Sequence, residues 1–539
     1  MADEHYGAGS EPVAGASRRP EDLTVAEFTE RPRMSPARPP FSINRFPVPI
    51  EEYRELELRA RQADGPGALS ALADTTTADQ DAAVEAGGQD LPEDQVAAAP
   101  TPLAPGTTVS FEGTTQTAFR PPDNAIAVGP NNVMIAVNVD LAVLSRAGAL
   151  QFRWPSYSLF NPVLPSGSQV FDPQLAYDHY ADRWIVVAAA RRASPAGSWL
   201  LVGVSQTANP LGAYWIWALN AQLNGSTTTN NWADFPQLGF DTQAIYITSN
   251  MFQITGSGTF QYVKLRILNK AELYAGGVGS GHTIKWYDFW DLKNPNGSTA
   301  FTVIPAKHFR GTGGNPAAYL VNALWPSGNQ LTMWTLTNPI GFWSGGSPSL
   351  SKVAVACRQY DLPPDGTQSG SSVRIETNDS RLLHAVYQNA GGVQRLWTCH
   401  TSRFTWAGDA EARSVVQWYE INVPTNAVVQ QNAYGASGRY YFFPAIQTDI
   451  SRNAYLVFSR SAADEFAHLR QTGRKVTDAA NDLQNSALVK AGLSVYTGGR
   501  WGDYFGICRD PANTAQVWMY GEYANTGNTW GTRVCAVKF

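Results

Sequence analysis

The segment GGRWGDYFGICRDPANTAQVWMYGEY, residues 498–523, decides the fold because the chain repeats its pattern. An acidic and an aromatic residue precede a short apolar run, then a turn and a second apolar run follow. Two related segments stand earlier, QVFDPQLAYDHYADRWIVVAAA from Gln169 and NWADFPQLGFDTQAIYITSN from Asn231. Self-similarity at such a spacing is typical of repeat architectures, so the repeats are interpreted before any single motif.

Seven copies of the pattern can be traced, with decay, between residues 106 and 539. Each copy has about 62 residues to itself, which suits four short strands with their loops. The second copy divides into QLAYD, RWIVVAAA, SWLLVGVSQ and AYWIWALNA, bounded by turn residues. We therefore predict an all-β fold, a seven-bladed β-propeller. The copies begin at Pro121, Phe171, Ala233, Gly314, Ser371, Tyr441 and Trp501.

The two ends of this region complement each other. The last copy offers only three strands, YFGICRD, QVWMYGEYA and WGTRVCAVKF, whereas GTTVSFEGTTQTAF from Gly106 belongs to no other copy. We expect residues 107–115 to pair with the C-terminal strand that ends at Phe539. Such pairing would close the ring and remove its free sheet edges.

Residues 1–105 differ in composition from the rest. They hold 19 acidic residues and 9 arginines, with no lysine or tryptophan, so the net charge of −5 for the whole chain divides into −10 and +5. This Ala- and Pro-rich composition predicts a largely disordered, flexible extension. Residues 39–62 stand apart, with aromatics between prolines and then a charged helical stretch. That stretch is either a solvated linker or a docking segment that orders on a partner or on its own propeller.

Composition excludes several classes of protein. The basic excess of residues 106–539 is small, so we expect no nucleic-acid partner. The first twenty residues, MADEHYGAGSEPVAGASRRP, contain no apolar core of a signal peptide, and no apolar stretch is long enough to span a membrane. The four cysteines show no CxxC spacing and no metal motif, and the strand assignment places Cys508 too far from Cys535 for a disulfide. We expect four free thiols.

Four aspartates occupy the same place in their copies. Asp123, Asp172, Asp234 and Asp503 stand where the chain enters the innermost strand of a blade, so we expect them near one mouth of the central channel. Either each carboxylate accepts backbone N–H groups of its own turn, as in Asx-turns, or the four form a ring that binds a cation such as Ca²⁺ or a polyhydroxy ligand. We expect the first arrangement.

Polar and aromatic neighbours of these aspartates complete a candidate ligand-binding site at the channel mouth. Tryptophans near turns could stack on sugar rings or anchor a protein partner, and an arginine could bind an acidic group. The neighbours are Trp232, Trp501, Tyr504 and Arg500.

The phrases GGRWGDY, DFPQLGFD and DPQLAYD resemble those of bacterial β-propeller proteins of the broad sialidase-like type. The resemblance covers about residues 107–539. It implies a propeller and an extracellular or surface-associated location, while most such proteins have no assigned activity. An intact Asp-box, Ser-x-Asp-x-Gly followed by Trp, does not occur in this sequence.

Three functions fit these observations. We predict a non-enzymatic binding or structural module at a cell or particle surface, recognising a glycan or protein partner without a cofactor. One alternative is a glycan-processing hydrolase or lyase at the channel mouth, since sialidases combine a tyrosine nucleophile with acids and arginines. Another is a tethered component of a larger assembly. Residues that would suit the hydrolase are Arg120, Arg183, Arg374, Glu376, Arg500, Tyr504 and Glu522.

Overall fold

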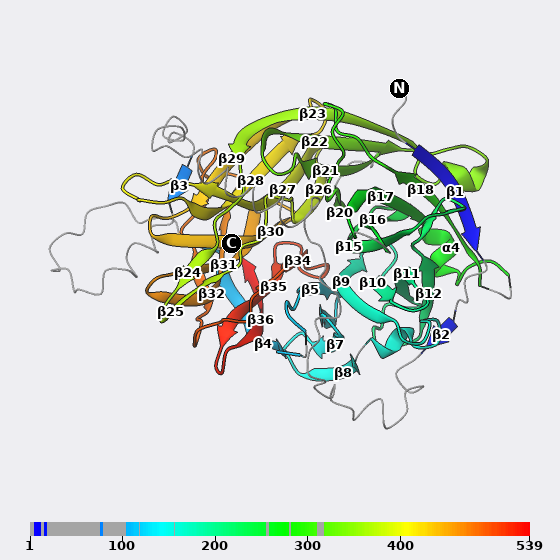
Figure 1. The fold of residues 1–539 in the computed structure, drawn as a ribbon, viewed down its shortest axis with the longest axis horizontal. Coiled ribbons are helices and arrows are strands. Elements are labelled where there is room, and N and C mark those ends of the chain that lie inside the picture. Colours follow the sequence, from blue (N-terminus) through cyan, green and yellow to red (C-terminus); the bar gives the residue numbers. More distant parts are fainter. Residues whose placement is uncertain are drawn as a thin grey trace.

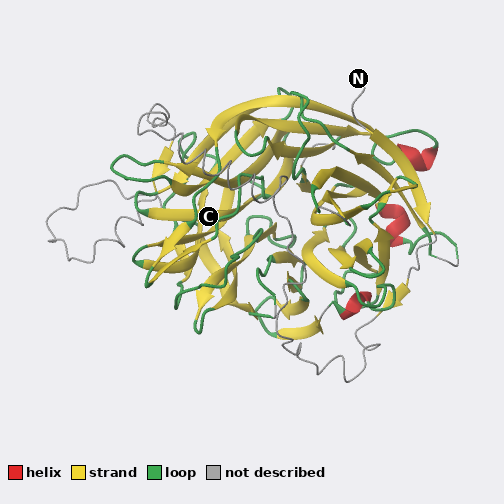
Figure 2. Cartoon of the chain, in the orientation of Figure 1, coloured by secondary structure: helices red, strands yellow, loops and turns green. Residues whose placement is uncertain are grey.

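The protein is an all-β propeller whose sheets are arranged around a common centre (Figure 1). Among the described residues, helices are limited to short segments (Figure 2), namely α4 (Lys270–Tyr274) and two 3-10 turns, η3 (Ser158–Phe160) and η4 (Gly341–Ser344). The computed structural model describes residues 5–11, 16–18, 76–78, 104–117, 119–155, 157–254, 258–279, 282–309 and 317–539.

Five blades stand as separate sheets. Two come early in the propeller, β5 (Ala125–Val128) to β8 (Leu150–Pro155) through β6 (Asn132–Val137) and β7 (Asp140–Ser145), and β9 (Gln169–Asp178), β10 (Arg183–Arg192), β11 (Gly197–Ser205) and β12 (Tyr214–Asn220). The others are β19 (Ile304–Pro305), β21 (Ala318–Ala323), β22 (Gly328–Thr337) and β23 (Ser349–Tyr360); β30 (Arg439–Thr448), β31 (Ala454–Ala462), β32 (Glu465–Arg474) and β33 (Ala487–Lys490); and β34 (Gly506–Arg509), β35 (Val517–Asn525), β36 (Thr529–Lys538) and β4 (Gly106–Thr115).

Two further groups of four antiparallel strands are joined in one eleven-stranded sheet. The short strand β20 (Lys307–Phe309) joins them, because it pairs in parallel with the first strand of each group. The chain that leaves β19 therefore pairs, through β20, with the first strands of the two neighbouring blades. The groups are β15 (Asn231–Phe240), β16 (Ala244–Gln253), β17 (Phe260–Asn269) and β18 (Ile284–Trp290), then β26 (His384–Ala390), β27 (Val393–Phe404), β28 (Arg413–Asn422) and β29 (Ala427–Gly435).

The last blade is completed from the other end of the described propeller. Strand β4 pairs antiparallel with β36, with Cys535 opposite Ser110, and the two strands lie side by side in Figure 1. The predicted pairing of residues 107–115 with the C-terminal strand is thus confirmed. Cys508 lies on β34 and Cys535 on β36, and all four cysteines are free, as expected.

Short segments of the first 105 residues add strands to blade edges. Strand β1 (His5–Glu11) pairs with β18, β2 (Ala16–Arg18) with β12 and β3 (Thr76–Ala78) with β29. Most of this extension, including residues 39–62, lies outside the described residues, so its flexibility and its docking role stay predictions. The remaining two-stranded sheets are β13 (Leu223–Asn224) with β14 (Thr227–Thr228) and β24 (Gly366–Gln368) with β25 (Ser371–Ile375).

The hydrophobic core lies between blades. One buried cluster combines Ile185 and Val187 of β10 with Ile245 and Ile247 of β16, so facing sheets share it. Because both faces of a blade are covered in this way, the strands carry continuous apolar runs instead of strict alternation. Large rings fill the space between sheets, and the fully buried tryptophans are Trp154, Trp184, Trp217, Trp286, Trp334, Trp397, Trp418, Trp501, Trp518 and Trp530.

The sequence misplaces the starts of two blades. Ser371 opens β25, which pairs with β24 in a separate sheet, whereas the first strand of the fifth blade is β26. The fourth copy was expected to begin at Gly314, but the first strand of that blade is β19, and the segment AYLVNA that follows Gly314 forms its second strand, β21. The residue that marks the start of this blade is Thr302, which has the left-handed backbone also found at Asp123 and Asp172. No acidic residue stands there, so the repeated phrase does not reveal it.

Candidate functional site

In several blades a left-handed residue stands just before the first strand or at an irregularity in the register within it. The φ angle is 54° at both Asp123 and Asp172, 51° at Phe235, 50° at Thr302 and 53° at Phe443. Residues other than glycine rarely adopt this left-handed backbone conformation, and aspartate adopts it more readily than most. The acidic residue of the repeated phrase thus suits a sharp bend in the chain.

The neighbouring blade holds each bend in place. The N–H of Asp172 donates to Oδ1 of Asn138 at 2.8 Å, and that of Phe235 donates to Oδ2 of Asp172 at 3.0 Å. Asn250 accepts from the N–H of Thr302, and Thr401 accepts from that of Phe443, each at 3.0 Å. The expectation that each carboxylate serves its own turn is therefore wrong for Asp172, which accepts the N–H of the next blade.

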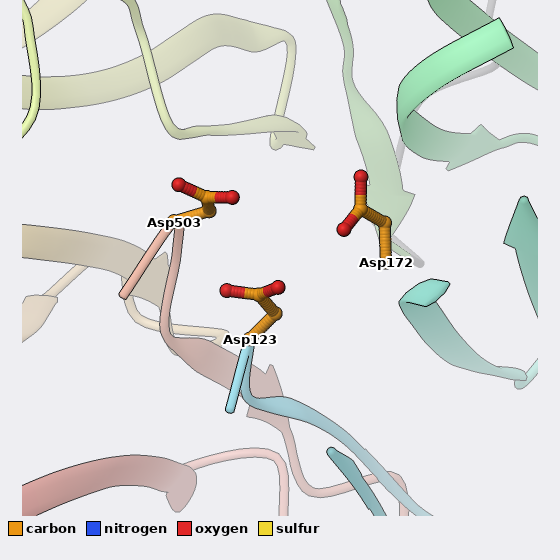
Figure 3. Close-up of side chains that lie close together, drawn as sticks. All are labelled: Asp123, Asp172 and Asp503. Atoms are coloured by element: carbon orange, nitrogen blue, oxygen red, sulfur yellow. The ribbon is translucent and has the colours of Figure 1, made fainter. Parts of the chain in front are cut away.

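Three carboxylates from three blades converge where the first strands begin. Asp123, Asp172 and Asp503 each offer one oxygen, and these oxygens all lie within 4.8 Å of one another. Figure 3 shows the three carboxylates directed towards a common space. They are 1%, 1% and 4% exposed, and the charge of buried Asp234 acts on Asp172. We name these four residues together with Glu522 the carboxylate cluster.

Glu522 joins this cluster from another strand. It lies on β35, is fully buried, and its charge acts on Asp123 and Asp503 through space. The sequence suggested Glu522 only as a residue for the hydrolase, not as a neighbour of the aspartates. It lies in the second apolar run of the repeated segment, far in sequence from the acidic residue at its start, so only the pairing of β34 with β35 brings it near the aspartates.

Hydrogen bonds satisfy only part of the cluster. Asp123 accepts from Nδ2 of Asn138, and Asp503 forms a short ion pair with Nη2 of Arg500. Among the described residues, five buried oxygens of the cluster accept no hydrogen bond. These are Oδ1 of Asp123, Asp172 and Asp234, and both carboxylate oxygens of Glu522.

Burial and mutual repulsion disfavour the charged form of these acids. Burial, followed by the charges of neighbouring aspartates, raises the pKa of Asp123, Asp172 and Glu522 well above the ordinary range. The same causes raise the pKa of Asp234 to about 7. The guanidinium of Arg500 opposes the shift at the three aspartates. The cluster therefore needs protons or additional positive charge.

A second arginine near the cluster, Arg381, forms an ion pair with a carboxylate outside the cluster. Arg381 binds both carboxylate oxygens of Asp379, at 2.8 and 2.7 Å, and its guanidinium lies 4.9 Å from the ring centre of Phe235. Its charge lowers the pKa of Asp234 from a distance. Of the acids in the cluster, Asp503 thus contacts Arg500 directly, while the charge of Arg500 acts on Asp123, Asp172 and Asp234 through space.

The aromatic residues expected at this site form its wall. Trp501 is fully buried and its Nε1 donates to Oγ of Ser459 at 2.9 Å, while Tyr504 donates its hydroxyl to the carbonyl of Pro173 at 2.8 Å. Trp232 is 2% exposed and packs beneath Arg191, whose guanidinium carbon lies 4.3 Å from the ring centre. Neither indole presents an open face to a sugar.

Of the residues suggested for a hydrolase, Arg500, Tyr504 and Glu522 lie at the carboxylate cluster, whereas three of the arginines contact other partners. Burial and nearby aspartates raise the pKa of Tyr504 well above its ordinary value, which disfavours a tyrosine nucleophile. Arg374 pairs instead with Glu411, and Arg183 lies over the ring of Tyr274. Arg120 lies over the ring of Tyr496.

A pocket of about 170 Å³ opens at the other ends of the same first strands. We name it the strand-end pocket. Its aromatic side is formed by Tyr177, His179, Phe240 and Phe309, and the rings of His179 and Phe309 stack at 5.3 Å with an angle of 1°. Cavities of this kind, apolar with a few polar groups, are the usual form of ligand sites.

Two cations line this pocket. Among the described residues Lys307 makes no ion pair, and burial lowers its pKa to about 8. Arg509 donates to the carbonyl of Thr448 at 2.7 Å and to that of Asp449 at 3.2 Å, and lies 4.7 Å above the ring centre of Phe309. Burial lowers the pKa of Arg509 to about 10. Both cations therefore gain from an anionic ligand.

The carboxyl groups of the pocket are occupied. Asp510 is paired with Arg146 and accepts Nε1 of Trp518 at 3.0 Å, and Asp182 accepts the hydroxyl of Tyr177 at 3.0 Å. The sequence did not point to this pocket. Its lysine comes from β20, which belongs to no repeated phrase.

The sequence matches no family model and no curated protein. Solved structures of similar shape include a Trypanosoma rangeli sialidase bound to sialic acid, at 10% identity and a TM-score of 0.35, covering 77% of this chain and 60% of the sialidase. The WD40 domain of SCAP from fission yeast has 12% identity and a TM-score of 0.31, covering 77% of this chain and 81% of that domain. An exo-beta-1,3-galactanase from Phanerochaete chrysosporium has 9% identity and a TM-score of 0.31, covering 80% and 99%.

These similarities concern the fold alone. The chain spans less than two thirds of the length of the sialidase. In the part of the chain that the structure describes, no helix has the length and apolar character to cross a membrane.

Proposed function

We propose that this chain is a non-enzymatic binding module at a cell or particle surface, built as a closed seven-bladed propeller. The contacts between first strands support the ring, because β5, β9, β15, β19, β26, β30 and β34 touch in that order and β34 touches β5 again. The pairing of β4 with β36 supports closure in the last blade. We propose that the module recognises a glycan or protein partner.

The strand-end pocket carries this proposal. Its volume of about 170 Å³ is below the roughly 300–1,000 Å³ of pockets for drug-sized ligands, so it suits one sugar ring or one side chain of a larger partner. Aromatic faces can stack on either group. Lys307 and Arg509 favour a carboxylate on that group, because charge-assisted hydrogen bonds are the stronger kind.

The chemistry of the pocket favours binding over hydrolysis. Most glycosidases need one carboxyl group as an acid and a second as a base or nucleophile. The two carboxyl groups of this pocket are Asp182 and Asp510, and Asp510 is held by Arg146, by Trp518 and by two backbone N–H groups. A carboxylate held in this way is a poor proton carrier.

A binding screen tests the proposal. The full chain is presented to an array of neutral and carboxylate-bearing glycans and to acidic and neutral peptides, with Lys307→Gln as the test variant. A matched control is Lys352→Gln, on β23 far along its blade from the pocket. We expect binding to one carboxylate-bearing class, lost at least tenfold in Lys307→Gln and retained in the control.

Three results would count against this function. Release of a shortened glycan during the screen would favour the hydrolase or lyase instead. Equal binding by wild type and Lys307→Gln would show that the ligand does not bind in the strand-end pocket. A stable partner that is lost only when residues 39–62 are deleted would favour the tethered component.

A further inference from the structure

The spacing of the three converging aspartates fits one ion. Calcium binds oxygen ligands at 2.3–2.6 Å, so two oxygens on the same ion lie no more than about 5.2 Å apart. The oxygens of Asp123, Asp172 and Asp503 all lie within 4.8 Å of one another. They come from three blades, so an ion between them would join the beginnings of three sheets.

Glu522 provides an independent observation. It is fully buried on β35, away from the left-handed bends, and neither of its oxygens accepts a hydrogen bond from a described residue. One oxygen lies 2.8 Å from the place where a Cβ on Gly502 would stand, beside Asp503 in the chain. Its strongest charge interactions are with Asp123 and Asp503. A buried carboxylate without a partner is costly, so its position beside the aspartates indicates an absent positive charge.

Arg500 and Arg381 do not fully neutralise the negative charge of the carboxylate cluster. Arg500 contacts Asp503 through one nitrogen, and Arg381 is engaged with Asp379. Unpartnered oxygens remain on Asp123, Asp172 and Asp234 as well as on Glu522. A cation at the centre of the carboxylate cluster would stabilise all of these unpartnered oxygens together.

The ligand atoms determine the kind of ion. The converging group consists of carboxylates alone, which suits hard cations such as Ca²⁺ and Mg²⁺. Magnesium usually keeps several of its water molecules, whereas calcium accepts a flexible cage of protein oxygens. Side chains that are 1–4% exposed leave little room for a hydration shell.

We propose that the carboxylate cluster is a calcium site in which Asp123, Asp172 and Asp503 bind the ion. Glu522 and Asp234 add negative charge around it, and Arg500 orients Asp503. The site does not depend on the proposed function, because the strand-end pocket lies at the opposite ends of the first strands.

Calorimetry of the full chain tests this site. After treatment with EDTA and dialysis, wild type is titrated with CaCl₂ and, separately, with MgCl₂, and its melting temperature is measured with and without Ca²⁺. We expect one Ca²⁺ per chain, weaker binding of Mg²⁺ and a higher melting temperature with Ca²⁺. Acidification should weaken Ca²⁺ binding, because protons compete for the same carboxylates.

Variants separate the site from the fold. Asp172→Asn keeps an oxygen for the N–H of Phe235 but removes a charged ligand, so it should fold and bind Ca²⁺ at least tenfold more weakly. The control is Asp464→Asn, an exposed carboxylate paired with Arg439, which should bind Ca²⁺ like wild type. The proposal is overturned if wild type shows neither heat of binding nor a change in melting temperature, or if Asp172→Asn responds to Ca²⁺ as wild type does.

Discussion

The two ends of the first strands are opposite in chemistry. Strand β9 carries both, with Asp172 near its beginning and Tyr177 near its end. At the beginning, the acids are buried and several of their oxygens have no partner among the described residues. At the end, aromatic rings and two cations surround an open pocket. We therefore propose different roles for the two ends, an ion site at the closed end and ligand binding at the open end.

The two ends also differ in origin. The carboxylate cluster is built around a repeated feature, a left-handed residue whose N–H donates to a side chain of the neighbouring blade. The strand-end pocket depends on an irregular feature, because Lys307 and Phe309 lie on β20, which leaves its own blade to pair with β15 and β26. Repetition thus builds the scaffold, and the exception to the repeat supplies a ligand-binding surface.

The largest expected effect comes from removing the strand that both ends depend on. Deletion of residues 106–116 removes β4 and leaves β36 without its outer partner. Because both ends belong to one ring, we expect several kcal/mol of lost stability and loss of Ca²⁺ and ligand binding together. Thermal unfolding followed by circular dichroism measures the change. Unchanged cooperative unfolding would show that the last blade does not need β4.

A smaller effect is expected within the carboxylate cluster. Asp172→Ala leaves the N–H of Phe235 without its acceptor, whereas Asp172→Asn keeps one. We expect the alanine variant to be less stable than the asparagine variant by about 1–3 kcal/mol, the cost of a buried unsatisfied donor. Urea unfolding in EDTA compares the two variants. Equal stabilities would mean that this bond between blades contributes nothing.

The smallest effect on stability is expected at the strand-end pocket. Lys307 makes no ion pair with a described residue and its charged form is disfavoured by burial, so Lys307→Gln should change stability by less than about 1 kcal/mol. The same variant should lose ligand binding, which separates a ligand-binding residue from a structural one. A large loss of stability, measured by urea unfolding, would instead assign Lys307 to the core.

The sequence predicts the repeated part of the molecule well. The phrases around Asp172, Asp234 and Asp503 locate first strands, and the unpaired segment from Gly106 locates the strand beside β36. The prediction fails where the chain departs from the repeat. Thr302 replaces the acidic residue and hides the start of one blade, so that copy was placed too late.

Side-chain environments were harder to infer than strands. Trp232 and Trp501 stand close to turns in the sequence, yet both are buried, because neighbouring blades cover the beginnings of the strands. Glu522 lies far in sequence from the repeated aspartate of its copy and Lys307 belongs to no copy, and only the folded arrangement brings them to a cluster or a pocket. Local sequence contains no signal for contacts of this kind between distant strands.

The central claim is that the carboxylate cluster lacks positive charge when no ion is bound. Asp234 tests it, since burial raises its pKa from 3.8 to about 7. A raised pKa in the folded state makes the wild type lose stability as pH rises from about 4 to about 7, while Asp234→Asn keeps a neutral side chain throughout. Titrating groups outside the carboxylate cluster, including buried histidines, are common to both proteins and cancel in the difference. Within the cluster, loss of the Asp234 charge also relieves the repulsion on Asp172, which adds to the advantage of the variant at higher pH.

The most direct measurement is therefore the difference in unfolding free energy between wild type and Asp234→Asn, in EDTA, at about pH 5 and about pH 8. We predict that the variant is more stable than wild type at the higher pH and that its advantage shrinks at the lower pH. Added Ca²⁺ should reverse the order at the higher pH, because only the wild type retains the full negative charge that holds the ion. A difference that does not change with pH, or a variant less stable than wild type at the higher pH without Ca²⁺, would contradict the account.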